Sequence, residues 1–178
     1  MKQIKKITII GNAGSGKSVL ARKLHTLFHL PVYHLDQYFW KPNWVMPDLN
    51  EFKIVHDELC ERDAWIIEGM CLPLLEYRVS QADMIIFLDM PRYLCFWRIF
   101  KRFTSYYGQE TPSSAKQCPE AFNWNFLRFL TVVWKFKGQD LPMIKGLLDA
   151  YASKKIVYTL QSQGEIDLFL KMVGSKIE

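Results

Sequence analysis

The sequence predicts an α/β fold in which helices flank a doubly wound parallel sheet of five strands. Three observations support this prediction. Short apolar segments rich in β-branched residues alternate with longer segments whose apolar residues recur at helical spacing. The first apolar segment, residues 4–10, leads into a glycine-rich loop and then a helical pattern. Three apolar segments end in an acidic residue, at the edge where parallel sheets bind their ligands.

The glycine-rich loop matches the pattern of a Gly, four residues, and then Gly-Lys-Ser/Thr, which predicts a phosphate-binding loop and a P-loop NTPase fold. Its glycines allow a tight turn whose backbone N–H groups point at phosphate oxygens. Lys17 would reach the β- and γ-phosphates, and the Ser18 hydroxyl would ligate Mg²⁺. The motif therefore predicts ATP and Mg²⁺ as cofactors. The predicted nucleotide-binding residues of the loop are Gly11, Asn12, Ala13, Gly14, Ser15, Gly16, Lys17 and Ser18.

A helix over residues 16–29 and a strand over residues 32–35 are predicted next, and Asp36 follows that strand. A carboxylate at this edge of the sheet can ligate Mg²⁺ through water or accept a proton from a substrate hydroxyl. The alternative for Asp36 is a loop residue that caps a neighbouring turn.

Residues 37–47 are aromatic and interrupted by prolines, which predicts an ordered loop rather than a helix or strand. The rings could form an acceptor pocket with Lys41 near a charged group, or an aromatic mini-core that holds the loop in place. Asp48 then opens a helix that runs to about Cys60. We therefore assign residues 37–62 to acceptor binding. The aromatic residues concerned are Tyr38, Phe39, Trp40 and Trp44.

Two further strands are predicted over residues 64–67 and 82–88, and they are followed by Glu68 and Asp89. Together with Asp36, these carboxylates should converge on the edge of the sheet that holds the phosphate loop. At least one of the three is expected to bind magnesium or act as a base, although the pattern does not rank them.

A helix over residues 92–107 carries Arg98 and Arg102 four positions apart on one stripe. Two arginines there could clamp transferring phosphates, or they could belong to a solvated basic face. Polar residues 108–121 predict a mobile loop, and we assign residues 103–140 to a lid. The remaining predicted elements are helices over 122–136, 141–152 and 162–172 and a strand over 155–160.

Composition is consistent with one domain spanning residues 1–178. No apolar run is long enough to span a membrane and no secretory signal is legible, so we expect a cytoplasmic protein without a membrane partner. The four cysteines lack a Cys-x-x-Cys pair, which favours reduced thiols. The net charge of +5 suits nucleic acid, but it equally suits a pocket for phosphates.

Four parts of the chain carry a resemblance to a known family: the phosphate loop, the strand before Asp36, the segment Leu-Asp-Gln-Tyr-Phe-Trp-Lys-Pro-Asn-Trp over 35–44, and the stretch 82–102. Together they resemble the topology modulation protein family. That family belongs to the adenylate-kinase-like P-loop kinases, and the resemblance covers nearly the whole chain. It implies a kinase fold with a helical lid insertion. It also implies that Arg98 and Arg102 contact the phosphates and adenine of ATP, and that Glu68 is associated with magnesium.

Two departures from that family bear on the acceptor. Glu68 stands where an Asp is usual, and the arginines that adenylate kinases use to hold AMP are missing at matching positions, with Arg78 the nearest candidate. We therefore expect a phosphotransferase that moves the γ-phosphate of Mg-ATP to a small acceptor other than AMP held in the usual way. The alternative is a nucleotide-gated ATPase or switch that binds nucleic acid through its basic helices.

Overall fold

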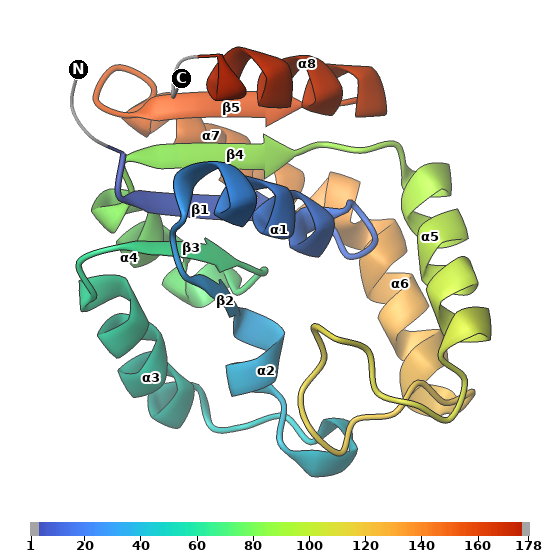
Figure 1. Ribbon diagram of the computed structural model, residues 1–178. Helices are drawn as coiled ribbons and strands as arrows, with labels where there is room; N and C mark the ends of the chain where they lie inside the picture. The colour runs from blue at the N-terminus through green and yellow to red at the C-terminus, as the bar shows by residue number, and fades with distance from the viewer. Residues whose placement is uncertain (1–3, 176–178) are drawn as a thin grey trace.

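A five-stranded parallel sheet forms the centre of the computed structural model, which describes residues 4–175 (Figure 1). The strand order is β2-β3-β1-β4-β5, and every pairing is parallel. The strand that precedes the phosphate loop is therefore the central one. This confirms the predicted sheet. The strands are β1 (Lys6–Gly11), β2 (Val32–His34), β3 (Trp65–Glu68), β4 (Met84–Leu88) and β5 (Ile156–Leu160).

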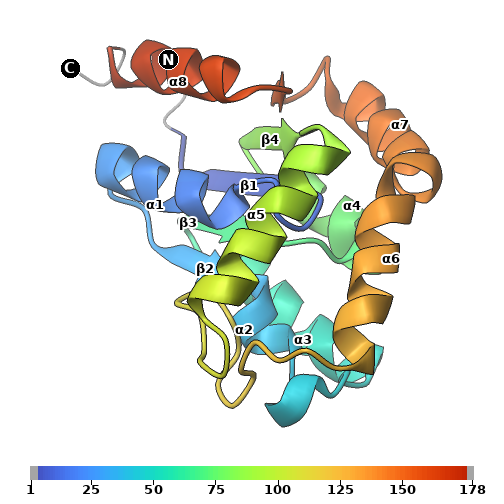
Figure 2. The same cartoon turned by 90° about the vertical axis from the view of Figure 1, so that its right-hand side faces the viewer.

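Helices cover both faces of the sheet (Figures 1 and 2). Strands β3 and β4 are buried along their whole length, and β1 is buried after its first residue, because apolar side chains from both layers pack on them. The helices are α1 (Lys17–Phe28), α2 (Leu35–Phe39), α3 (Leu49–Glu61), α4 (Leu72–Gln81), α5 (Arg92–Ser105), α6 (Trp124–Gln139), α7 (Leu141–Tyr151) and α8 (Gln163–Gly174).

The apolar core consists of one cluster on each face of the sheet. The first includes Leu24 of α1 and Phe169 of α8, and the second includes Leu59 of α3 and Leu148 of α7. Helix α6 contributes to both clusters, Val133 to the first and Phe136 to the second. Since it bridges the two layers, α6 is tied to the body of the fold rather than projecting from it as a free arm.

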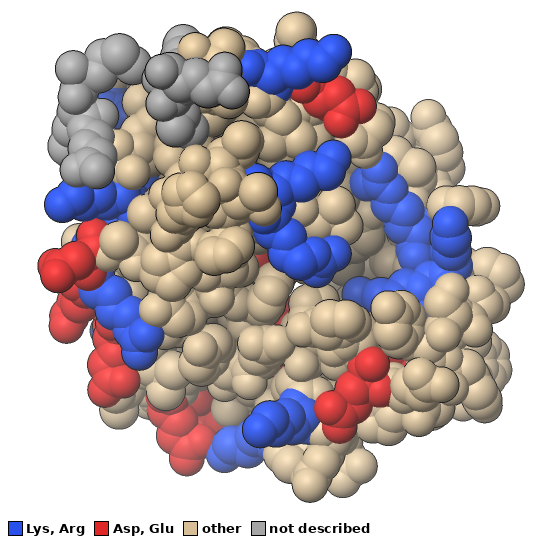
Figure 3. All heavy atoms as spheres, viewed as in Figure 1, with Lys and Arg blue, Asp and Glu red and all other residues tan. Residues whose placement is uncertain are grey.

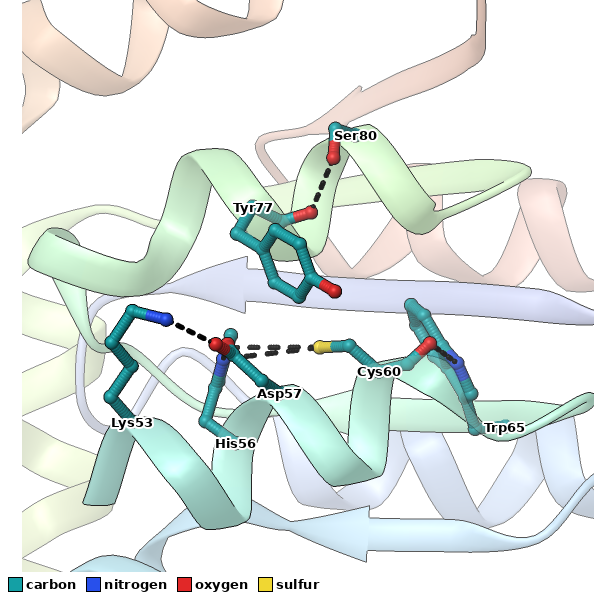
Figure 4. A network of polar contacts seen from close by, with 7 residues as sticks. All are labelled: Lys53, His56, Asp57, Cys60, Trp65, Tyr77 and Ser80. Carbon is teal, nitrogen blue, oxygen red and sulfur yellow. Dashed lines mark hydrogen bonds and ion pairs between the residues drawn. The ribbon is translucent and has the colours of Figure 1, made fainter. Parts of the chain in front are cut away.

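A polar network lies between α3 and α4 (Figure 4). The His56 side chain is fully buried; its Nδ1 lies 3.0 Å from Asp57 Oδ1, and Lys53 pairs with the same aspartate. Burial lowers the pKa of His56 despite that carboxylate. The indole N–H of Trp65 donates to the Cys60 carbonyl at 3.1 Å, which fastens α3 to the start of β3. The contacts of this network lie within α3 and α4 and at the start of β3.

Two helices were absent from the sequence prediction. Helix α4 begins with a proline in its first turn, where the missing N–H costs nothing, and it buries Leu75 and Val79. Helix α2 is a single short turn that begins one residue before Asp36, so β2 ends at His34. Asp36 therefore lies in the first turn of a helix rather than in a loop after the strand.

No helix among residues 4–175 is both long and apolar enough to cross a membrane.

We expect Ile86→Ala to lower the free energy of unfolding by about 2–5 kcal/mol, because Ile86 is fully buried in β4 and its truncation leaves a cavity. Ile54→Ala on α3 is the matched control, since the Ile54 side chain is 64% exposed and its loss should cost within about 0.5 kcal/mol. Urea unfolding of the two variants checks this. Equal losses would contradict the burial assigned to β4.

Candidate nucleotide-binding and catalytic site

The phosphate loop lies against α5 so closely that only glycine fits at position 14. Gly14 has a φ of 74°, and a Cβ there would lie 2.4 Å from the Cys95 carbonyl oxygen. Positive φ values and near contact with another backbone are the two conditions that favour glycine. Gly14 is one of the four residues between the two fixed glycines of the motif, so the glycine at this position reflects packing on α5.

Contacts from α5 and α6 hold the loop in shape. The Asn12 side-chain amide donates to the Val133 carbonyl of α6 at 2.9 Å, and its Oδ1 accepts from the Ala13 N–H at 2.8 Å. Arg98 Nη1 donates to the Ser15 carbonyl at 2.8 Å. Lys17 Nζ donates to the Asn12 carbonyl at 3.0 Å, so its ammonium group lies over the loop. The residues predicted to bind nucleotide are therefore gathered in one preorganised loop.

Ser18 and Glu68 meet at the start of α1. The Ser18 hydroxyl donates to Glu68 Oε1 at 2.7 Å, and His34 Nδ1 lies 2.6 Å from the same oxygen. Burial would raise the pKa of Glu68, but the His34 hydrogen bond, the Lys17 charge and the Ser18 hydroxyl outweigh it and lower the pKa below 4.5. An ionised carboxylate beside a hydroxyl suits Mg²⁺, which prefers oxygen ligands and keeps several waters. These two residues therefore fit the predicted metal site.

Asp36 faces the same site from α2. The residue keeps exposed surface, yet crowding by surrounding protein, followed by repulsion from Glu68, raises the pKa of its carboxyl above 3.8. The Asp36 pKa is lowered by the charges of Lys17, Arg102 and His34, but these do not outweigh the effects that raise it. The structure thus brings Asp36, Glu68 and Lys17 together at one edge of the sheet. Figure 3 shows a hollow on this face, with Lys and Arg side chains along its rim over α1 and α5.

The third predicted carboxylate, Asp89, lies apart from the other two. Strand β4, which it follows, is on the far side of β1 from β3. Asp89 Oδ1 pairs with Lys137 Nζ of α6 at 3.0 Å, and its Oδ2 accepts from Gln161 Nε2 at 3.2 Å. The sequence did not rank the three carboxylates. The structure separates Asp89 from the pair beside Ser18 and Lys17.

The two arginines of α5 are held by specific partners rather than lying on a freely solvated face. Arg98 contacts the loop through Ser15 and reaches Gln163 Oε1 at 3.1 Å, at the start of α8. Arg102 Nε lies 2.8 Å from Glu120 Oε1, and Glu120 is buried. Arg102 is close enough to influence the Asp36 carboxyl. Arg98 therefore borders the phosphate loop, and Arg102 lies near the Asp36 carboxyl.

The aromatic segment after Asp36 makes contacts of the kind expected for a mini-core. Phe39 packs edge-on against Phe52 of α3 with ring centroids 4.9 Å apart, and Trp40 packs against Trp44 at 5.7 Å. The Trp44 indole donates to the Pro119 carbonyl at 3.0 Å. Tyr38 remains 43% exposed, and Lys41 pairs with Glu51 on the surface. It stays a prediction that an acceptor contacts this segment, at Tyr38, Trp40, Lys41 and Trp44.

Residues 108–121 were expected to form a mobile loop, but the structure docks this segment on the aromatic loop. Asn43 N–H donates to the Gln117 carbonyl at 2.8 Å, and Gln37 Nε2 donates to the Pro112 carbonyl at 3.1 Å. The buried Cys118 thiol contacts the Lys41 carbonyl at 3.3 Å. The two regions predicted to bind the acceptor and to act as a lid therefore lie side by side.

Arg78 occupies a different position from the one expected of a substrate-binding residue. Its side chain is fully buried on α4, and Nη2 donates to the Gly69 carbonyl at 2.9 Å. Burial lowers its pKa to about 10. In this arrangement Arg78 supports the turn between β3 and α4, and an acceptor could reach it only if that turn moved.

Two site residues, His34 and Glu120, were missed by the sequence analysis. His34 lies within the predicted strand over residues 32–35, two positions before Asp36, and a histidine there has no distinctive spacing. Glu120 lies eighteen positions after Arg102, so no local pattern links them. Both act through contacts that only the folded chain creates.

Comparisons with known proteins identify the fold. No family model and no curated protein match this chain. Among solved structures, shikimate kinase from Acinetobacter baumannii matches with a TM-score of 0.63 and 18% identity over 99% of this chain and 94% of that one. A gluconokinase from Sinorhizobium meliloti 1021 matches with a TM-score of 0.55 and 11% identity over 99% and 93%.

A putative kinase from Chloroflexus aurantiacus also matches, with a TM-score of 0.55 and 14% identity over 98% of both chains. These similarities confirm the predicted α/β fold, a five-stranded parallel sheet flanked by helices. They give no support to the expected membership of the topology modulation family, and at such identities they carry the fold alone.

We expect Asp36→Asn to raise the free energy of unfolding near neutral pH. A carboxyl whose pKa is raised by folding binds more protons in the folded than in the unfolded state, so stability falls as the pH rises through and above 3.8. The amide removes this cost, and its advantage should shrink as the pH is lowered toward 3.8. Urea unfolding at several pH values measures the difference.

Asp63→Asn is the control for this measurement, because Asp63 is an exposed residue before β3 and its change should alter stability by within about 0.5 kcal/mol. If the Asp36→Asn variant were less stable than the starting protein at neutral pH, the prediction would be wrong. The attraction of Lys17 and Arg102 would then outweigh the effects that raise the pKa of Asp36.

Proposed function

We propose that this chain is an ATP-dependent phosphotransferase that moves the γ-phosphate of Mg-ATP to a hydroxyl of a small acceptor, such as a nucleoside, a nucleotide or a related metabolite. The observation that carries this proposal is the convergence of Lys17 and Ser18 of the phosphate loop with Glu68 and Asp36 at one edge of the sheet. A phosphate cradle alone would serve binding. Acidic groups beside it supply what transfer to a hydroxyl requires.

Binding of Mg-ATP falls to the phosphate loop and the groups around it. Ser18 and Glu68 would hold Mg²⁺, which when bound neutralises charge on the phosphates. Lys17 would move from the Asn12 carbonyl to the β- and γ-phosphates. Arg98 already touches the loop at Ser15, and it would contact the nucleotide there. Most of this catalysis is positioning and electrostatic stabilisation.

Asp36 is our candidate for the acceptor side of the reaction. Its raised pKa makes it a stronger base than an ordinary aspartate, and its exposed surface leaves room for a hydroxyl to approach. It would position or deprotonate that hydroxyl, or hold the metal through water. Arg102 is expected to stabilise charge on the transferring phosphoryl group. Residues 37–47 and the docked segment 108–121 would surround the acceptor.

Two solved structures with the same fold bear kinase names that refer to small molecules, shikimate and gluconate. This supports a small acceptor over a macromolecular one. The alternative is a nucleotide-gated ATPase that binds nucleic acid through a basic surface. Against it, Arg98, Arg102 and Lys137 are engaged by partners around the loop and are not part of an open basic face.

We expect Lys17→Ala to lower turnover by at least ~10²-fold while the fold is kept, on the scale of losing one preorganised electrostatic contact. Lys23→Ala is the matched control, because Lys23 lies on the same helix and pairs with Asp167 on the surface. The measurement is ADP release from Mg-ATP with acceptor present. A folded Lys17→Ala variant with undiminished turnover would remove the loop from the mechanism.

The acceptor can be identified by measuring ADP release from Mg-ATP against nucleosides, nucleoside monophosphates and small hydroxylated metabolites, with DNA and RNA added separately. We expect one small molecule to stimulate release and to yield its own phosphorylated product. Stimulation by nucleic acid alone, with steep salt dependence and without phosphorylated product, would favour the gated ATPase.

A further inference from the structure

His34 and Glu68 are direct neighbours in the sheet. The register of the parallel strands β2 and β3 pairs these two residues, so their side chains share one face. His34 Nδ1 lies 2.6 Å from Glu68 Oε1, and the His34 side chain is 14% exposed. The contact is therefore set by strand pairing rather than by a flexible loop.

One oxygen of Glu68 receives two hydrogen bonds. Oε1 accepts from the Ser18 hydroxyl at 2.7 Å and from His34 at 2.6 Å. An ionised carboxylate can only accept, so His34 Nδ1 must carry the hydrogen. Among residues 4–175, no hydrogen bond reaches Oε2. Fixing Oε1 from two sides leaves the other oxygen in a defined place.

A glutamate at this position requires more support than a shorter side chain would. Its extra methylene adds one rotatable bond, and a carboxylate that moves among rotamers is a poor metal ligand. Metal sites commonly solve this by hydrogen bonds that orient the ligand from outside. His34 stands where such a bond would come from, because it touches Glu68 and lies on the adjoining strand.

We propose that His34 is a positioning residue for the magnesium site: by donating to Glu68 Oε1 it holds the carboxylate beside Ser18 in the orientation that binds Mg²⁺. This inference rests on the proposed function insofar as Glu68 belongs to a magnesium site. His34 acts through Glu68 and contacts neither metal nor substrate.

The test measures ADP affinity by calorimetry over a series of Mg²⁺ concentrations, for the starting protein and for His34→Ala. We expect His34→Ala to weaken the apparent Mg²⁺ affinity by about 10- to 100-fold, the usual effect of removing a hydrogen bond that orients a metal ligand. ADP affinity in the presence of a chelator should not change. His25→Ala is the matched control, because His25 lies on α1 and contacts the Leu30 carbonyl.

His34→Asn separates positioning from mere packing. The asparagine side-chain nitrogen is attached to Cγ, as Nδ1 of histidine is, so it can donate to the same oxygen with a smaller side chain. We expect His34→Asn to retain Mg²⁺ affinity within a few-fold of the starting protein. Loss of Mg²⁺ affinity in both variants would assign His34 to the packing of β2 and overturn the proposal.

A double-mutant cycle shows whether His34 acts through Glu68. In a Glu68→Ala background the acceptor is gone, so adding His34→Ala should weaken Mg²⁺ affinity no further. An additional loss of the full size would mean that His34 acts by another route, and the proposal would fail. The proposal also fails if Mg²⁺ does not alter ADP affinity in the starting protein.

These outcomes are distinguishable from failure of the proposed function. A protein that binds Mg-ADP with the pattern above, but yields no phosphorylated acceptor, supports the role of His34 and contradicts phosphotransfer alone.

Discussion

The contact between the phosphate loop and α5 is the constraint on which the rest of the site depends. Gly14 can approach the Cys95 carbonyl only because it lacks a Cβ. That approach brings Arg98 to the Ser15 carbonyl, less than a turn further along the same helix. Asn12 completes the arrangement by bonding to α6. Contacts with both helices therefore hold the loop in its shape.

The sequence predicted the parts of this site that are local in the chain. The strand, loop and helix around Lys17 are contiguous, and the buried strands are legible as apolar runs. It did not predict α4, because Arg78 places a charged residue on the buried face of that helix and interrupts its short apolar pattern. Nor could it pair His34 with Glu68, since that pairing depends on the register of two strands 34 positions apart.

The two carboxyl groups of the site respond to the same surroundings in opposite ways. Crowding by surrounding protein acts to raise the pKa of both carboxyls, and the Lys17 charge acts to lower the pKa of both. Glu68 also accepts hydrogen bonds from His34 and Ser18, which stabilise its ionised form and lower its pKa. Within residues 4–175 the Asp36 carboxyl accepts no such bond, and it is repelled by Glu68. When the surroundings of two nearby carboxyl groups push their pKa values apart, the two groups can take different chemical roles.

Arg102 links the lid-like segment to the phosphate site. Its ion pair with Glu120 adds a charged contact to the hydrogen bonds that dock residues 108–121. Glu120 is 5% exposed, and a carboxylate buried to that extent is costly without its partner. Movement of Arg102 toward a bound phosphate would therefore require Glu120 to move with it or to reach water. Under the proposed function, the Arg102–Glu120 ion pair would therefore couple nucleotide binding to the position of residues 108–121.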